Sequence, residues 1–341
     1  MRSRFYINPN DLDEVYPPIT PFSSMSPEQV EILRRRLDSS ILVSGGPCSG
    51  KTVLAIGLAK RFSDEGKKCL YVARTSLLQS YAKEGASFLG LRDLKCISFF
   101  EATKDNTPYD VIIVDDSEWY SLEEIKSLVS LAQYVFLLGN YTRSFLWRKA
   151  ASIPDISAII PGCRVYSLNI QMGVPFEFIR LIPRNTGFIN HKSTGRLPVI
   201  AKVGSIKDQC ASIKTIVDAM GFDNVGILCY TQELVASVRL IFDQLEMPVE
   251  VYHGRIVDVD WNSTKPMIMT IASSSGIHFN TVFVVGFDAD IVDISQDVCL
   301  ETAVTRAREN LYIFYEKQLP QSLAIIPQAY YRSLNNYSIE L

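Results

Sequence analysis

Short apolar runs, separated by longer amphipathic or polar segments, follow one another along residues 41–140. The runs are rich in Val, Ile and Leu, have the length of strands, and several end in Gly, Asp or Asn. Continuous apolar runs of this length indicate strands that are buried on both faces, as in an α/β fold with a parallel sheet. The predicted strands are residues 41–43, 69–73, 96–100, 110–114 and 134–140.

The same pattern returns after residues 184–198, a segment rich in Gly, Pro and polar residues. Such a composition is typical of a boundary between domains. The chain therefore predicts an N-terminal arm at 1–24, a first lobe at 25–185 and a second lobe at 195–341. In the second lobe, strands are predicted at 225–231, 249–253, 267–275, 280–288 and 310–316, and helices at 233–245 and 297–308.

The first strand runs into a glycine-rich turn and then into a helix-like segment. With Lys51 and Thr52 the turn fits Gly-x-x-x-x-Gly-Lys-Thr in its strand–turn–helix context. There, backbone N–H groups bind phosphate, the lysine reaches the β- and γ-phosphates, and the threonine hydroxyl ligates Mg²⁺. The predicted nucleotide-binding residues are Gly45, Gly46, Pro47, Cys48, Ser49, Gly50, Lys51 and Thr52. The alternative is a glycine-rich turn before an ordinary helix.

Two acidic residues, Asp115 and Asp116, end the apolar run at 110–114. Downstream of a phosphate loop, an acid at the end of a buried strand is expected to hold Mg²⁺. Asp115 is therefore predicted as a metal residue together with Thr52. The alternative is an acidic cap between strand and loop.

Basic residues surround an aromatic side chain after the strand at 134–140. Trp147, with Arg143 and Arg148 nearby, could stack bases beside phosphate-binding charges. Equally, Trp147 could pack in a core between solvated cations. Both interpretations stay open on this pattern alone.

A helix is expected to begin near Ser26, with Ser26 as N-cap, Pro27 at the first helical position and Glu28 in the first turn. Gln29 follows them, just before the strand that leads into the phosphate loop. Its amide could read the edge of an adenine, which its position alone leaves undecided.

The composition limits the class of protein. With 341 residues, 47% hydrophobic and 21% charged, the chain is long enough for two globular domains. Its net charge of −3 gives no overall basic signature, so nucleic acid would have to bind in a local groove. Seven irregularly spaced cysteines indicate reduced thiols. Without a signal-peptide pattern or a long apolar run, we expect an intracellular protein and no membrane.

The order of these signals resembles the motor core of superfamily 1 helicases of the UvrD/Rep type. It is also similar to the helicase-like domain of Schlafen-type proteins. The resemblance covers roughly residues 25–316, and its most specific segments are 45–52 and 302–313. It implies two tandem RecA-like lobes with mainly parallel sheets, with ATP and Mg²⁺ held between them.

The resemblance also implies roles for individual residues. It assigns Arg306 as an arginine finger on the γ-phosphate and Gln29 as the adenine reader, and it places Gly276 in the motif that touches nucleotide and strand. It places Thr75 and Trp147 toward single-stranded nucleic acid, and Arg148, the basic residue next to Trp147, is the third predicted contact.

Several motifs depart from the family pattern. Asp116 stands where the family has the Glu that orients or deprotonates the attacking water, and Glu118 could compensate. Arg143 stands at a family Gln position and Gln171 at a family Arg position. We interpret this as an exchange that keeps one cation and one amide at the γ-phosphate. Asp116, Arg143 and Gln171 are therefore catalytic candidates beside Lys51 and Arg306.

Two functions are compatible with these motifs and candidate residues. The first is a Mg²⁺-dependent ATPase that acts on, or moves along, single-stranded nucleic acid. The alternative is a helicase-derived regulatory or assembly subunit, which binds ATP, hydrolyses it slowly or not at all, and signals to a protein partner. The altered motifs and the acidic balance favour the alternative, whereas the intact phosphate loop and Arg306 favour retained nucleotide chemistry.

Overall fold

The computed structural model describes residues 25–88, 90–141, 151–169, 173–182, 193–252, 259–261, 263–288 and 296–335. The predicted arm at 1–24 lies outside them. Contacts divide the chain into two compact units: one holds the described residues 25–169 and Val259, and the other holds the remaining described residues from 173 onward. The lobe limits predicted from composition, 25–185 and 195–341, stay predictions.

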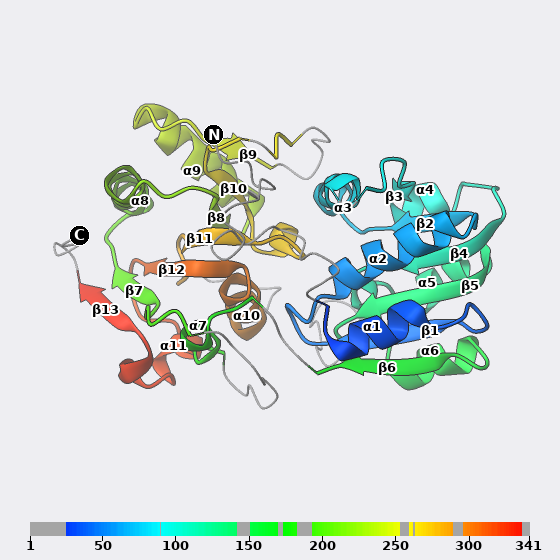
Figure 1. The fold of residues 1–341 in the computed structure, drawn as a ribbon. Coiled ribbons are helices and arrows are strands. Elements are labelled where there is room, and N and C mark those ends of the chain that lie inside the picture. The colour runs from blue at the N-terminus through cyan, green and yellow to red at the C-terminus, as the bar shows by residue number, and fades with distance from the viewer. Residues whose placement is uncertain are drawn as a thin grey trace, which may run out of the picture. The chain divides into compact units, whose positions relative to one another are not determined.

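The described strands of the first unit form one six-stranded sheet in which every pair is parallel (Figure 1). In spatial order they are β3 (Cys96–Ile97), β2 (Cys69–Val72), β4 (Tyr109–Val114), β5 (Ala132–Gly139), β1 (Ile41–Gly45) and β6 (Arg164–Leu168). β1 is internal, with Leu42 paired to Leu137 on one side and to Val165 on the other. The phosphate-loop motif therefore starts from the end of a strand that is fixed on both sides.

Helices pack against this sheet in two groups. They are α1 (Pro27–Arg34), α2 (Lys51–Asp64), α3 (Ser76–Phe88), α4 (Phe99–Ala102), the 3₁₀ helix η2 (Ser117–Trp119), α5 (Leu122–Val129) and α6 (Ile153–Ile159). α2 contacts α1 and α3, and α5 contacts α4 and α6. Phe62 of α2 meets Phe136 of β5 with ring centroids 5.2 Å apart. Leu42 and Val114 belong to the core that also includes Leu128 of α5.

The second unit has its own parallel sheet, seven-stranded within the described residues. In spatial order the strands are β13 (Arg332–Asn335), β7 (Val199–Lys202), β12 (Ala307–Tyr315), β11 (Phe279–Val284), β8 (Val225–Cys229), β10 (Met267–Thr270) and β9 (Glu250–Val251). Its helices are α7 (Phe176–Ile179), α8 (Ile206–Met220), α9 (Gln232–Gln244), η3 (Ala272–Ser274), α10 (Gln296–Val304), α11 (Gln321–Ala324) and η4 (Gln328–Tyr330). Ile227, Phe242 and Phe283 are fully buried in its core.

Several elements differ from the sequence prediction. The strand expected at 267–275 ends at Thr270, and residues 272–274 form η3. The strand expected at 96–100 ends at Ile97, because Ser98 caps α4 through its hydroxyl and the Glu101 backbone. The helix expected at 297–308 ends at Val304, because Ala307 already pairs with Phe279 in the sheet. The C-terminal segment, for which no strand was predicted, forms β13 along β7. No helix among the described residues is long and apolar enough to cross a membrane.

Candidate functional site

The loop between β1 and α2 has the backbone of an anion-binding turn. Cys48 (φ 59°) and Gly50 (φ 80°) both adopt the left-handed conformation. Turns that include left-handed residues gather backbone N–H groups into a concave surface that binds anions. The left-handed φ of Gly50 favours glycine, and a Cβ at this position would also displace the end of the Gln29 side chain. The sequence motif thus coincides with a turn that is shaped for phosphate.

Two side chains of the loop fit a phosphate ligand. Lys51 is 8% exposed, and its Nζ donates hydrogen bonds to the carbonyl oxygens of Gly45 and Gly46, both at 2.9 Å. Ser49 is 2% exposed, and its Oγ is buried without a hydrogen-bond partner among the described residues. A buried hydroxyl without a partner is costly. Phosphate oxygens would pair with this hydroxyl and with the Lys51 ammonium.

Gln29 is tied to the same loop. Its Oε1 accepts a hydrogen bond from Ser26 N at 2.7 Å, and Ser26 Oγ accepts one from Gln29 N, which completes a capping box on α1. Its Nε2 donates to the carbonyl oxygen of Gly50 at 3.0 Å. Gln29 therefore joins the first turn of α1 to the phosphate loop. Its reading of adenine stays a prediction.

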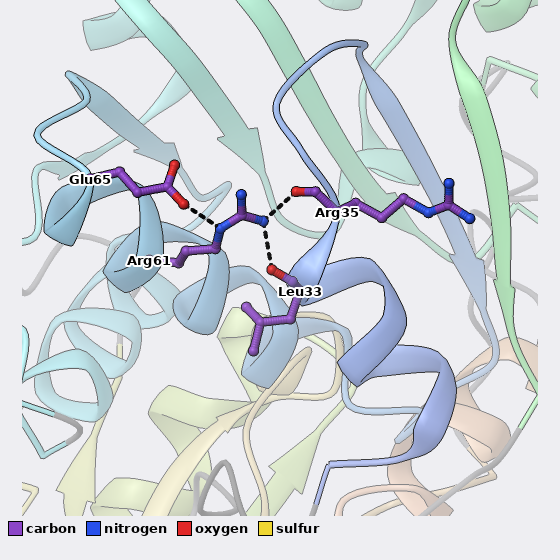
Figure 2. A network of polar contacts seen from close by, with 4 residues as sticks. All are labelled: Leu33, Arg35, Arg61 and Glu65. Carbon is purple, nitrogen blue, oxygen red and sulfur yellow. Dashed lines mark hydrogen bonds and ion pairs between the residues drawn. The ribbon is translucent and has the colours of Figure 1, made fainter.

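The other end of α1 is held by Arg61 of α2 (Figure 2). Arg61 Nη1 donates to the carbonyl oxygens of Leu33 (2.6 Å) and Arg35, and Nε donates to Glu65 at 2.7 Å. These carbonyls end α1 and would otherwise lack partners within the helix. α1 is thus attached to the loop at its start and to α2 at its end. Sequence reasoning missed Arg61, because a basic residue near the end of a helix is ordinary.

Arg61→Ala is expected to lower the free energy of unfolding by about 2 kcal/mol, because the two carbonyls and Glu65 lose a charged donor. The matched control is Lys60→Ala, one residue earlier on α2, whose exposed pair with Asp64 is worth less than about 0.5 kcal/mol. Urea denaturation of both variants checks this. Equal stability of the two variants would show that Arg61 does not anchor α1.

Asp115 lies directly after β4 and is fully buried. Its Oδ2 accepts a hydrogen bond from Tyr71 Oη at 2.8 Å and its Oδ1 accepts one from Asp116 N at 3.1 Å. The nearby Thr52 side chain favours the charged form of the carboxylate. Burial, and next the charge of Asp116, raise the pKa of Asp115 to about 6. The two predicted metal residues therefore lie near one another, and their oxygens are of the kind that Mg²⁺ prefers.

Asp116 starts η2 in a left-handed conformation with φ 51°, which is uncommon for a residue other than glycine. Its carbonyl oxygen accepts a hydrogen bond from Trp119 N at 3.1 Å. The end of β5 lies against the same turn, since a Cβ on Gly139 would come within 2.9 Å of the Glu118 nitrogen. The turn that carries Asp116 is therefore fixed by close packing as well as by hydrogen bonds.

Arg306 lies in the second unit, in the turn between α10 and β12. It is 5% exposed, and its guanidinium donates to Thr302 O (3.2 Å), Ile277 O (3.4 Å) and Thr305 Oγ1 (2.9 Å). Gly276 lies next to Ile277, with φ 78°. Within this unit Arg306 thus joins the end of α10 to the segment that leads into β11. Its action on a γ-phosphate stays a prediction.

His278 lies beside this arginine. Burial, and next the positive charges of Arg308 and Arg306, hold the pKa of His278 well below its usual range, so the imidazole is neutral. The imidazole bonds to the backbone of Thr305. His278 is therefore a packed neutral side chain.

The remaining site predictions fall into two groups. Thr75 Oγ1 accepts a hydrogen bond from Leu78 N at 3.1 Å, so this hydroxyl caps the start of α3. Beside it, Arg74 lies over the Trp119 ring with its Cζ 4.0 Å from the ring centroid. The other predicted residues lie outside the described part of the chain: Arg143, Trp147, Arg148 and Gln171.

No family model and no curated protein matches the chain. Among solved structures, Mss116p bound to ssRNA and AMP-PNP is similar with a TM-score of 0.57, at 10% identity, over 92% of this chain and 74% of that one. The PRRSV helicase is similar with a TM-score of 0.51, at 12% identity, over 88% of this chain and 56% of that one. The fold is helicase-like.

The helicase-like fold agrees with the architecture of the described residues. Two mainly parallel sheets, each with its own helices, match the tandem RecA-like lobes of a helicase. The predicted fold class is thus confirmed, and so is the resemblance to helicases. The chain spans about half the length of the PRRSV helicase (56%). At these identities the likeness concerns the fold alone.

Proposed function

We propose that this chain is a Mg²⁺-dependent ATPase of the helicase type that acts on single-stranded nucleic acid. The observation that carries the proposal is the proximity of the Thr52 side chain to the buried carboxylate of Asp115. It joins the phosphate-loop motif to the acid after β4, which are the two places where a nucleotide and its metal are held in such enzymes. In this proposal the phosphates lie against residues 45–52, and Gln29 and Gly276 contribute to nucleotide binding.

In this proposal the residues of the first unit have separate roles in ATP hydrolysis. Lys51 and Ser49 bind phosphate oxygens, and Thr52 and Asp115 hold the metal. Mg²⁺, when bound, neutralises charge on the phosphate oxygens. Asp116 orients the attacking water or takes its proton.

The remaining catalytic candidates are proposed to stabilise negative charge on the phosphates. Arg306 comes from the second lobe, and Arg143 and Gln171 join it; we propose that they stabilise charge in the transition state. The same proposal includes membership of superfamily 1. It also includes the exchange by which Arg143 and Gln171 supply the cation and the amide at the γ-phosphate.

Nucleic acid is the proposed partner because the two structural neighbours are helicase-like in fold and one of them is bound to ssRNA. In this chain Thr75 lies at the carboxyl end of β2, the edge of a parallel sheet where ligands bind. Thr75, Trp147 and Arg148 are the proposed contacts.

A second candidate is a nucleotide-binding regulatory or assembly subunit with weak hydrolysis, which signals to a protein partner. The observation that favours it is Asp116, whose side chain is one methylene shorter than the family's Glu and whose backbone is left-handed. A displacement of about 1 Å at a reacting group can cost roughly a hundredfold in rate.

Steady-state ATP hydrolysis, measured with Mg²⁺ and with or without single-stranded DNA or RNA, separates the two candidates. The ATPase predicts turnover that one nucleic acid stimulates and that Lys51→Ala removes. Tight ATP binding with negligible turnover under every condition would favour the regulatory subunit. Turnover that Lys51→Ala retains would contradict both.

A further inference from the structure

Tyr71 is a buried polar side chain in an otherwise apolar strand. It is the third residue of β2, and Leu70, Tyr71 and Val72 are all 0% exposed. β2 pairs with β4, with Tyr71 opposite Ile113 and Val72 opposite Val114, so Tyr71 reaches Asp115 from the neighbouring strand. Its hydroxyl donates to Asp115 Oδ2 at 2.8 Å. Burial, and next the charge of Asp115, raise the pKa of Tyr71 well above its usual value, so the phenol remains a donor.

The hydrogen bonds of Asp115 assign a specific role to this phenol. Oδ1 accepts a hydrogen bond from the backbone N–H of Asp116 at 3.1 Å, and Oδ2 accepts the one from Tyr71. Tyr71 therefore supplies a side-chain donor from a strand that is itself outside the phosphate loop. A carboxylate held by donors on separate elements keeps one orientation about its χ angles.

We propose that Tyr71 is a positioning residue, which fixes the carboxylate of Asp115 in the orientation that holds Mg²⁺ with the bound nucleotide. The inference rests on the proposed function, because it concerns the metal of the same site. Tyr71 does not touch nucleotide or metal in this account, and it acts only through Asp115. Partners of this kind typically change metal affinity by about 10- to 100-fold when they are removed.

The test uses Tyr71→Phe, which deletes the hydroxyl and keeps the ring that packs in β2. Binding of a fluorescent ATP analogue to the full chain is titrated in EDTA and then at increasing Mg²⁺. We expect the Mg²⁺ concentration for half-maximal enhancement of binding to rise about tenfold, while binding in EDTA stays as in the wild type. A loss of packing would weaken binding in both conditions.

The matched control is Tyr120→Phe. Tyr120 is 4% exposed in the same unit, and its hydroxyl has no hydrogen-bond partner among the described residues. This variant should leave both titrations unchanged.

Three results would count against the proposal, and they are distinguishable. A wild-type Mg²⁺ requirement in Tyr71→Phe would overturn the positioning role alone, and so would an equal loss of binding in EDTA and in Mg²⁺. A wild-type chain that binds the analogue without any effect of Mg²⁺ would overturn the proposed metal site, and the positioning role with it.

Discussion

Lys51→Ala is expected to weaken ATP binding by roughly a hundredfold or more and to abolish turnover. Two unit charges 4 Å apart interact by about 4 kcal/mol near a protein surface, and each 1.4 kcal/mol is about tenfold in affinity. Water that enters the vacated space offsets part of this. The ammonium of Lys51 is held by Gly45 O and Gly46 O, so its charge lies at the loop before any ligand arrives.

Equilibrium titration with an ATP analogue measures the effect. The control is Lys83→Ala, an exposed lysine on α3 of the same unit, which should bind as the wild type does. Circular dichroism shows whether each variant is folded. A folded Lys51→Ala variant with wild-type affinity would show that the loop is an ordinary glycine-rich turn.

Asp115→Asn is expected to change turnover and stability in opposite directions. The neutral amide would hold Mg²⁺ poorly, and we expect turnover to fall by roughly a hundredfold or more, as for loss of a group that stabilises charge directly. In the absence of Mg²⁺ the same change should stabilise the protein at neutral pH. The wild-type carboxylate is fully buried, and its ionisation there is opposed by burial and by Asp116.

The pH dependence follows from the direction of the pKa shift. The pKa of Asp115 rises from 3.8 to about 6 in the folded chain, so between these values the native state binds more protons than the unfolded state. Wild-type stability should therefore fall as pH rises from about 4 to about 6, by up to about 3 kcal/mol, and this contribution should then be constant. The stability of Asp115→Asn should not show this fall, because the amide does not ionise.

Urea denaturation in EDTA at pH 4, 5, 6 and 7 checks this stability difference. Asp110→Asn, at the other end of β4, is the control, and its difference from the wild type should not follow the same curve. A lower stability of Asp115→Asn than of the wild type at pH 7 would contradict the account.

The local features of the fold could be predicted from sequence. The apolar runs around Val43, Ile112 and Leu137 form central strands of the sheet. This was predictable because a strand that is buried on both faces of a parallel sheet needs a continuous apolar run. The phosphate loop was equally predictable, since its glycines, lysine and threonine lie within eight residues. Both depend on neighbours in sequence.

Features that depend on distant residues could not be predicted. The bond from Tyr71 to Asp115 joins positions 44 apart, and Arg61 reaches carbonyls 28 and 26 residues away. Arg306 was placed at the end of a helix, but it lies in a turn because Ala307 pairs with β11. β13 exists only through its pairing with β7. Such contacts leave no periodic signal in the chain.

The most direct test of the central claim is isothermal titration of the full chain with AMP-PNP in Mg²⁺. The account predicts saturable binding of one nucleotide per chain, weakened by EDTA and lost in Lys51→Ala. Absence of saturable binding by a folded wild-type chain, or binding that Lys51→Ala retains, would contradict it.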